Sequence, residues 1–160
     1  MTSDDTVSVR VVSAFEGKRL EPLRQWWLGL EAAGTLPTRS HFKLADWKAH
    51  LPWIAVADVI RARSGEIADG LIRVWGTGLT APFGGDATGQ KLSDFGEPYV
   101  QRWMTPALLV EETRKPVAVQ GRVLLPGKDF QRFEGLFLPL FDAQPRFERL
   151  LSEFELVKSP

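Results

Sequence analysis

The sequence predicts an α+β domain in which helices pack on one face of a five-stranded antiparallel sheet. Strand-like runs rich in β-branched and aromatic residues form two groups separated by a helical middle: residues 53–60 and 71–75, then 117–125, 133–141 and 150–157. Strands clustered toward both ends of a chain cannot form an alternating βαβ array, so an antiparallel sheet is expected. The length of 160 residues and the hydrophobic fraction of 44% fit one core.

Residues 1–17 are expected to form a flexible N-terminal arm, although Val7, Val9 and Val11 alternate as they would in a short strand. Residues 18–158 are expected to form a single domain. No internal repeat or low-complexity block divides this stretch, which supports one folding unit.

The domain is predicted to begin with a helix over residues 20–33, because apolar side chains recur there at helical spacing. Gly34 ends this helix and Pro37 follows it. Two interpretations of the apolar stripe stay open: it packs on its own domain, or it pairs with a second copy of itself. The stripe consists of Leu20, Leu23, Trp26, Trp27 and Leu30.

The next segment, residues 36–52, mixes proline and polar residues with a few aromatics, which favours a loop with a short helix. The first two strand-like runs are joined by the polar segment 61–70 and predict an antiparallel hairpin with a long connection. Gly76 and Gly78 flank the exit of the second strand, where a positive φ or a close approach of two backbones often requires glycine.

The middle of the chain, residues 76–96, is rich in Gly, Thr, Asp and Pro and predicts short helices and turns. After Pro98, apolar residues at helical spacing predict a longer helix that ends near residues 114–116. Pro106 interrupts the pattern, so either the helix begins again at Thr105 or it kinks.

Composition excludes several classes of function. Twenty Lys and Arg balance twenty Asp and Glu, so no bulk charge draws the protein to nucleic acid or anionic lipid. The absence of cysteine excludes disulfides, thiolate nucleophiles and zinc–cysteine or iron–sulfur sites. The N-terminus lacks the pattern of a secretory signal, and no apolar run approaches the roughly 18 residues that span a bilayer. We therefore expect a cytoplasmic protein that binds neither nucleic acid nor membrane.

Side chains suited to catalysis or metal binding are sparse. The two histidines, His41 and His50, have no acidic or thiol ligand at metal-binding spacing, so a capping or surface role is expected. The serines lie in polar loops without a nucleophile elbow, and Tyr99 is the single tyrosine. We therefore expect no enzymatic activity, no metal and no cofactor.

Four short segments of the chain form an ordered set: residues 36–40 (Leu-Pro-Thr-Arg-Ser), 73–77 (Arg-Val-Trp-Gly-Thr), 83–89 (Phe-Gly-Gly-Asp-Ala-Thr-Gly) and 134–140 (Glu-Gly-Leu-Phe-Leu-Pro-Leu). Together they resemble the PAS_5-type family of bacterial PAS domains. Each is short, but all four occur in the family's order, and the resemblance covers residues 20–157. It implies a PAS fold: a five-stranded antiparallel sheet in the order 2-1-5-4-3 with helices over one face, here with an extra N-terminal helix.

Two of these segments also have local physical roles. Asp86 or Thr88 is expected to accept hydrogen bonds from backbone N–H groups in the turn that follows the hairpin. Arg73 is expected to pair with a carboxylate near the sheet, such as Glu134, rather than to reach a ligand.

The resemblance implies a stand-alone sensory or regulatory domain in bacterial signalling that acts through contact with another protein. We expect a homodimer, an unidentified signalling partner, and an interface that uses the N-terminal helix and an exposed part of the sheet. The interface residues would be Leu23, Trp26, Trp27 and Leu30.

In a PAS fold, large side chains surround the space between sheet and helices. They either fill that space as core or line a cavity for a small apolar or aromatic metabolite. Arg122 would give the cavity one polar anchor or face solvent. The candidate ligand-binding residues are Trp75, Phe83, Phe95, Trp103, Arg122 and Phe137. From a different class, the alternative is a small-molecule enzyme on an α+β cone-like fold.

Overall fold

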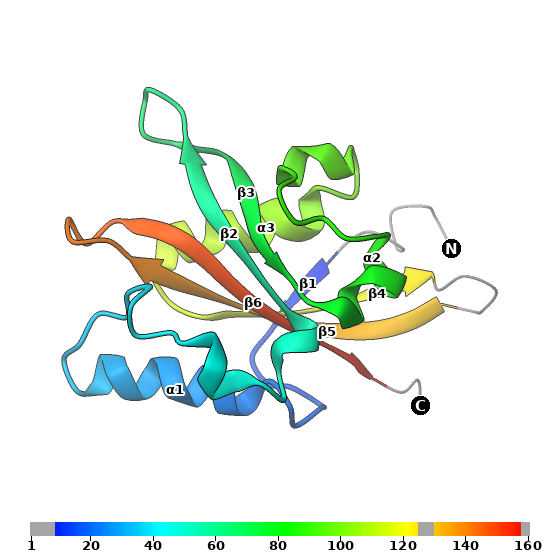
Figure 1. Ribbon diagram of the computed structural model, residues 1–160, viewed down its shortest axis with the longest axis horizontal. Helices are drawn as coiled ribbons and strands as arrows, with labels where there is room; N and C mark the ends of the chain where they lie inside the picture. The colour runs from blue at the N-terminus through cyan, green and yellow to red at the C-terminus, as the bar shows by residue number, and fades with distance from the viewer. Residues whose placement is uncertain (1–8, 125–129, 158–160) are drawn as a thin grey trace.

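A six-stranded antiparallel sheet runs through the molecule in the order β1-β4-β5-β6-β2-β3 (Figure 1). The computed structural model describes residues 9–124 and 130–157; residues 1–8 of the expected arm and residue 158 lie outside this range. The strands are β1 (Val9–Val12), β2 (Ile54–Arg61), β3 (Ile67–Trp75), β4 (Val117–Leu124), β5 (Phe130–Phe141) and β6 (Phe147–Val157).

The five predicted strands are neighbours in the predicted order, which reads β3-β2-β6-β5-β4 along the sheet. The prediction was wrong in strand number, because β1 pairs with β4 and adds a sixth strand at that edge. Val11 of β1 lies opposite Val119 of β4, inside the segment that was expected to be an arm. The sheet therefore has a PAS-like order with one strand added.

Helices and short 3₁₀ turns connect the strands. Gly34 follows α1 with a φ of +80°, a conformation that suits glycine at a helix end. The long helix α3 continues through Pro106, so it does not begin again at Thr105. The helical elements are α1 (Glu21–Ala32), η2 (Leu44–Trp47), η3 (Leu51–Trp53), η4 (Thr77–Leu79), α2 (Thr80–Phe83), η5 (Leu92–Phe95) and α3 (Gln101–Thr113).

The prediction placed helices on one face, but in the structure they cover both faces of the sheet. Every residue of β5 from Phe133 to Phe141 is buried. Because successive side chains of a strand point to opposite faces, such a run needs cover on both sides. Rings of α2 and α3 contact Phe133 and Phe137 on one face. The segment that leads into α1 bonds to Glu134, the neighbour of Phe133 on the other face (Figure 1).

The hairpin β2–β3 meets η3 in a tight backbone contact. A Cβ atom on Gly76 would lie 2.3 Å from the carbonyl oxygen of Pro52. The N–H of Gly76 also donates to the carbonyl of Ile54 at 2.8 Å. The φ of Gly76 is −63°, so a close approach, and not a positive φ, requires glycine here.

The turn after the hairpin is held as expected from its sequence. Asp86 accepts hydrogen bonds from the backbone N–H and the hydroxyl of Thr88, at 2.9 and 2.7 Å. Arg73 does not pair with Glu134. Its guanidinium instead bonds to Asp58 on the neighbouring strand at 2.7 Å, because the two residues lie on the same part of the sheet.

Candidate functional site

The space between the sheet and α3 is filled with aromatic rings in mutual contact. Trp103 of α3 is the centre of this aromatic layer: its ring centroid lies 5.6 Å from that of Trp75, 5.7 Å from Phe95 and 6.0 Å from Phe137. Such offset and edge-to-face contacts are the favoured geometries for buried rings. The layer consists of Trp75, Phe83, Phe95, Trp103, Phe133, Phe137 and Phe154.

Five of the six predicted ligand-binding residues therefore lie together. Arg122 does not join them, because its side chain is exposed on β4. Its backbone carbonyl accepts a hydrogen bond from Arg102 at 2.7 Å. Arg102 is the cation that borders the layer: it is 9% exposed and its guanidinium lies 5.8 Å from the ring centre of Phe133. Burial lowers the pKa of Arg102 from its usual value.

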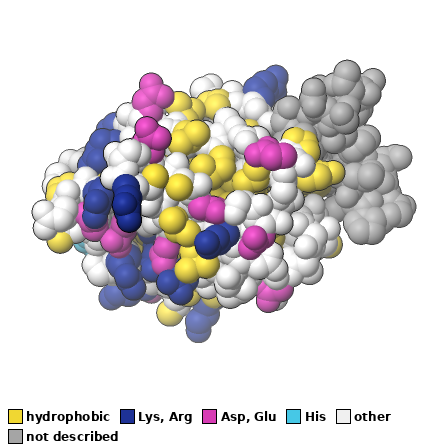
Figure 2. All heavy atoms as spheres, turned by 90° about the horizontal axis from the view of Figure 1, so that it is seen from above, with side chains coloured by type: hydrophobic (Ala, Val, Ile, Leu, Met, Phe, Trp, Pro, Cys, Tyr) yellow, Lys and Arg dark blue, Asp and Glu magenta, His cyan; other side chains and the backbone are white. Residues whose placement is uncertain are grey.

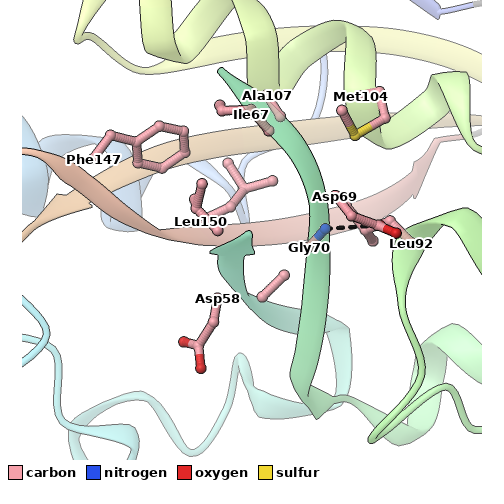
Figure 3. Close-up of a pocket in the computed structure, with 11 residues that line it drawn as sticks. Asp58, Ile67, Asp69, Gly70, Leu92, Met104, Ala107, Phe147 and Leu150 are labelled. Atoms are coloured by element: carbon pink, nitrogen blue, oxygen red, sulfur yellow. Dashed lines mark hydrogen bonds between the residues drawn. The ribbon is translucent and has the colours of Figure 1, made fainter. Parts of the chain in front are cut away.

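A shallow apolar pocket lies beside this layer, between the hairpin β2–β3 and α3 (Figure 3). Its volume is about 240 Å³, counting the open space at its mouth. Asp69 lies at its rim and is already bonded to the N–H of Gly70 at 2.8 Å. None of the six predicted ligand-binding residues lines it. The apolar lining includes Ile67, Leu92, Met104, Ala107, Phe147 and Leu150.

The four predicted interface residues on α1 divide by burial. Leu23 and Trp27 have 0% exposure and belong to the core, and the indole N–H of Trp27 donates to the carbonyl of Pro139 at 2.8 Å. Trp26 and Leu30 are half-buried. The stripe thus packs on its own domain, as the first interpretation had it, and leaves Trp26 and Leu30 at the surface.

Trp26 belongs to a second group of rings, outside the core. Its centroid lies 5.7 Å from that of Phe42 and 6.2 Å from that of Trp47, which comes from η2. Phe42 and Trp47 are half-buried like Trp26, and Leu44 beside them is 39% exposed. We call Trp26, Phe42 and Trp47 the surface aromatic cluster.

A buried polar cluster on the α1 side of the sheet was missed by the sequence analysis. Glu153 of β6 has 0% exposure, and its Oε2 lies 2.7 Å from Nδ1 of His50. The guanidinium Nε of Arg19 lies 3.6 Å from the same oxygen. His50 was expected to have a capping or surface role; it stands at the N-cap of η3, but its side chain binds this carboxyl.

The electrostatics of this cluster follow from burial. Desolvation raises the pKa of Glu153 to about 8, against the lowering effect of Arg19. Desolvation, together with the charge of Arg19, lowers the pKa of His50.

The sequence held one indication of this buried cluster: Glu153 and Glu155 alternate with Ser152 and Phe154. The same alternation is expected of a strand with one face in water, so it does not predict a buried acid.

The other histidine has a local role. Nδ1 of exposed His41 accepts a hydrogen bond from the backbone N–H of Thr38 at 2.9 Å.

Within residues 9–124 and 130–157, no group of three His, Cys, Asp or Glu side chains is placed to hold a metal ion. In the same part of the chain, no helix has the length and apolar character needed to cross a membrane.

Comparison with known proteins adds one similarity. No family model matches the sequence, and a search of curated proteins finds no match. The structure is similar to the crystal structure of the PAS domain of a protein from Colwellia psychrerythraea. The TM-score is 0.48 at 15% sequence identity, over 71% of this chain and 96% of that chain. A likeness at this level assigns neither a family nor a function.

Proposed function

We propose that this protein is a cytoplasmic sensory or regulatory module of the PAS_5 type that works through protein contacts, with a second copy of itself and with a signalling protein. The observation that carries the proposal is the closed aromatic layer, in which the rings of Trp75, Trp103 and Phe137 fill the space between sheet and helices. A filled interior favours a protein that acts through its surface. The five-strand order β3-β2-β6-β5-β4, which the PAS resemblance implies, supports the module type.

The alternative, an enzyme on a cone-like fold, needs convergent proton-transfer groups that a substrate can reach. Among the described residues, the cluster best suited to proton transfer is His50 with Glu153. The carboxyl of Glu153 is fully buried on the α1 side of the sheet, away from the apolar pocket. This placement favours a docking module over an enzyme.

The contact surface that we propose is the outer side of α1. Trp26 and Leu30 are half-buried there, and the surface aromatic cluster continues the apolar surface toward exposed Leu44. Contiguous apolar surface of this kind marks interaction sites in soluble proteins. The two core residues of the predicted interface, Leu23 and Trp27, would act by holding α1 on the sheet.

Light scattering during size exclusion, with native mass spectrometry, tests the homodimer. We expect the wild-type protein to be a dimer and Leu30→Arg to be a monomer, because a charge in an apolar interface is left without a partner. Leu108→Arg is the matched control: Leu108 is 49% exposed on α3, away from α1. A monomeric wild-type protein, or a dimer that survives Leu30→Arg, would contradict the proposed interface.

The apolar pocket supports a second candidate function, the sensing of a small apolar or aromatic metabolite. Native mass spectrometry of freshly purified protein would then show added mass that is lost on denaturation. Met104→Trp places a larger side chain in the pocket wall, and we expect it to abolish the added mass. Added mass that persists in this variant would place the ligand elsewhere, and its absence from the wild-type protein would favour the docking module alone.

A further inference from the structure

Two segments that cover the α1 side of the sheet meet at one buried carboxyl of β6. Glu153 lies in the middle of β6, between Leu136 of β5 and Ile54 of β2 in the strand register. The segment before α1 contributes Arg19, and the start of η3 contributes His50. Because Glu153 has 0% exposure, its ionisation must be balanced by these neighbours and not by water.

Near neutral pH the carboxyl and the imidazole share one proton. Oε2 of Glu153 is 2.7 Å from Nδ1 of His50, whereas Oε1 is buried with no hydrogen-bond partner among the described residues. Within this part of the chain Oε1 has no donor in either protonation state, but a buried charged oxygen without a donor costs more than the neutral carbonyl oxygen of the acid form, and burial raises the pKa of Glu153 to about 8. Burial lowers the pKa of His50, which favours its neutral form. In the acid form the O–H of Glu153 donates to Nδ1 of the His50 tautomer that carries its proton on Nε2.

Arg19 lies near the same carboxyl and is its second potential partner. Its Nε is 3.6 Å from Oε2 of Glu153, too far for a hydrogen bond, and is buried without another partner. The guanidinium lies over the ring of Trp53, 4.9 Å from its centre, and donates to the carbonyl of Phe154. A movement of under about 1 Å would bring Nε into hydrogen-bonding range of the carboxylate.

The other charged groups nearby are held in contacts of their own. Glu155 on β6 accepts the backbone N–H of Arg19 at 3.2 Å, and its charge also raises the pKa of Glu153. Glu134 on β5 accepts the N–H groups of Glu16 and Gly17 at 2.9 and 2.7 Å. These contacts keep the segment before α1 on the sheet whichever partner Glu153 takes.

His50 connects this buried carboxyl to the surface. Its ring lies edge-to-face with Trp47, 5.1 Å between centroids, and Trp47 contacts Trp26 of α1. The hydrogen bond to Glu153 therefore ties the surface aromatic cluster to β6 through His50. Losing it would remove the tie between this segment and Glu153, while the backbone contact of η3 with Gly76 would stay.

We propose that His50, Glu153 and Arg19 form a proton-operated latch. With its proton, Glu153 bonds to His50 and holds the η2–η3 segment on β6. When the proton leaves to solvent, no proton remains between the carboxylate and Nδ1 of this His50 tautomer, which keeps its own proton on Nε2. The carboxylate then turns to Arg19, His50 is released, and Trp47 changes its packing at the surface. The latch goes beyond the proposed docking function and does not depend on it.

Nuclear magnetic resonance of ¹³C-Glu, ¹⁵N-Trp protein from acid to alkaline pH tests the latch. We expect the Glu153 carboxyl to titrate with a midpoint near pH 8, and the indole N–H signal of Trp47 to shift with the same midpoint. A Glu153 midpoint near its ordinary value of 4.5, or a Trp47 signal that does not follow it, would overturn the proposal.

Three variants separate the latch from a merely structural contact. Glu153→Gln keeps a donor toward His50 and removes the ionisation, so the Trp47 transition should vanish. Arg19→Gln removes the alternative partner and its charge, so the Glu153 midpoint should move to higher pH. His41→Gln, at the other histidine, is the control and should change neither the Glu153 midpoint nor the Trp47 transition. If Glu153→Gln does not fold, Arg19→Gln decides: a Trp47 transition that moves with the Glu153 midpoint supports the latch, and a Trp47 transition that does not move with it refutes the latch.

Discussion

At Gly76 the backbone of β3 passes so close to η3 that a side chain has no room. A Cβ there would meet the backbone of Leu51 and Pro52 at 2.4 and 2.3 Å, and backbone cannot move aside as a flexible side chain can. Gly29 is the opposite case, since a Cβ on this exposed helical residue meets nothing within 4 Å. The sequence places Gly76 at a strand exit and Gly29 inside a helix, and the structure shows what a Cβ atom at each position would meet.

We therefore expect Gly76→Ala to lower the free energy of unfolding by about 3 kcal/mol. Gly29→Ala should raise it by about 0.5–1 kcal/mol, because alanine favours the helix interior over glycine. Urea denaturation followed by Trp fluorescence measures both. Equal effects of the two substitutions would contradict the close contact at Gly76.

Ionisation of Glu153 makes stability depend on pH. Its pKa is raised from 4.5 to about 8 in the folded protein, so the folded state holds this proton more tightly than the unfolded chain. The stability that this group contributes is complete below pH 4.5 and is lost as pH rises from there through 8. The pKa of His50 is lowered from 6.5 in the folded protein, so above pH 6.5 this histidine is neutral in the folded protein and mostly neutral in the unfolded chain. Its effect on stability above pH 6.5 is therefore small.

The wild-type protein should therefore have a lower free energy of unfolding at pH 9 than at pH 7, and Glu153→Gln should remove most of this difference. At acid pH the dependence has the opposite sign, because the pKa values of three carboxyls are lowered from 3.8 in the folded protein: Asp69, Asp86 and Asp142. The stability that these carboxylates contribute is lost as pH falls below 3.8. Urea denaturation at each pH is the measurement. If the free energy of unfolding of Glu153→Gln falls with rising pH as steeply as that of the wild-type protein, another group titrates.

At the scale of elements, α3 is held on the sheet by one large side chain. Trp103 is 4% exposed and contacts rings from β3, β5, β6 and η5, whereas Leu108 on the same helix is 49% exposed. We expect Trp103→Ala to lower the free energy of unfolding by about 3–5 kcal/mol. The matched Leu108→Ala should change it by less than about 1 kcal/mol, and a comparable loss there would contradict the packing.

The edge strand β1 protects a longer strand. It pairs with β4 from Val9↔Gly121 to Val12↔Ala118, and an unpaired β4 would expose a row of backbone donors and acceptors. We expect deletion of residues 1–12 to lower the melting temperature and cause association that grows with concentration. Deletion of residues 1–8 leaves β1 in place and serves as control. Calorimetry with light scattering measures both effects, and identical behaviour of the deletions would count against a role for β1.

At the scale of the whole molecule, charges of both signs lie on the face that Figure 2 shows. Figure 2 shows hydrophobic side chains gathered in the middle of the face seen from above, the side of the β2–β3 hairpin, with acidic and basic groups around them. This distribution matches the even balance of twenty basic and twenty acidic residues. Contacts of this protein should therefore depend on local apolar surface and vary little with salt, which binding measured over a range of ionic strength would check.

Much of the architecture could be predicted because it rests on local patterns. The apolar stripe of α1 and the runs that became β2 to β6 carry their periodicity in adjacent residues. The glycine at residue 76 and the Asp86 turn were predicted from the same kind of signal. The four-residue strand β1 was missed, because so short an alternation does not predict a strand by itself, and β1 forms only by pairing with β4.

The sequence by itself determined the α+β class, the order of the elements along the chain and the residues able to form a core. Only the tertiary structure decided what those residues face. It filled the space between the sheet and α3 with rings, buried Leu23 and Trp27 against their own sheet, and placed α1 over the second face. That cover turned Glu153 from an outward strand residue into a buried acid beside His50. The reason is physical: burial and pKa depend on atoms far apart in the chain, which no local pattern records.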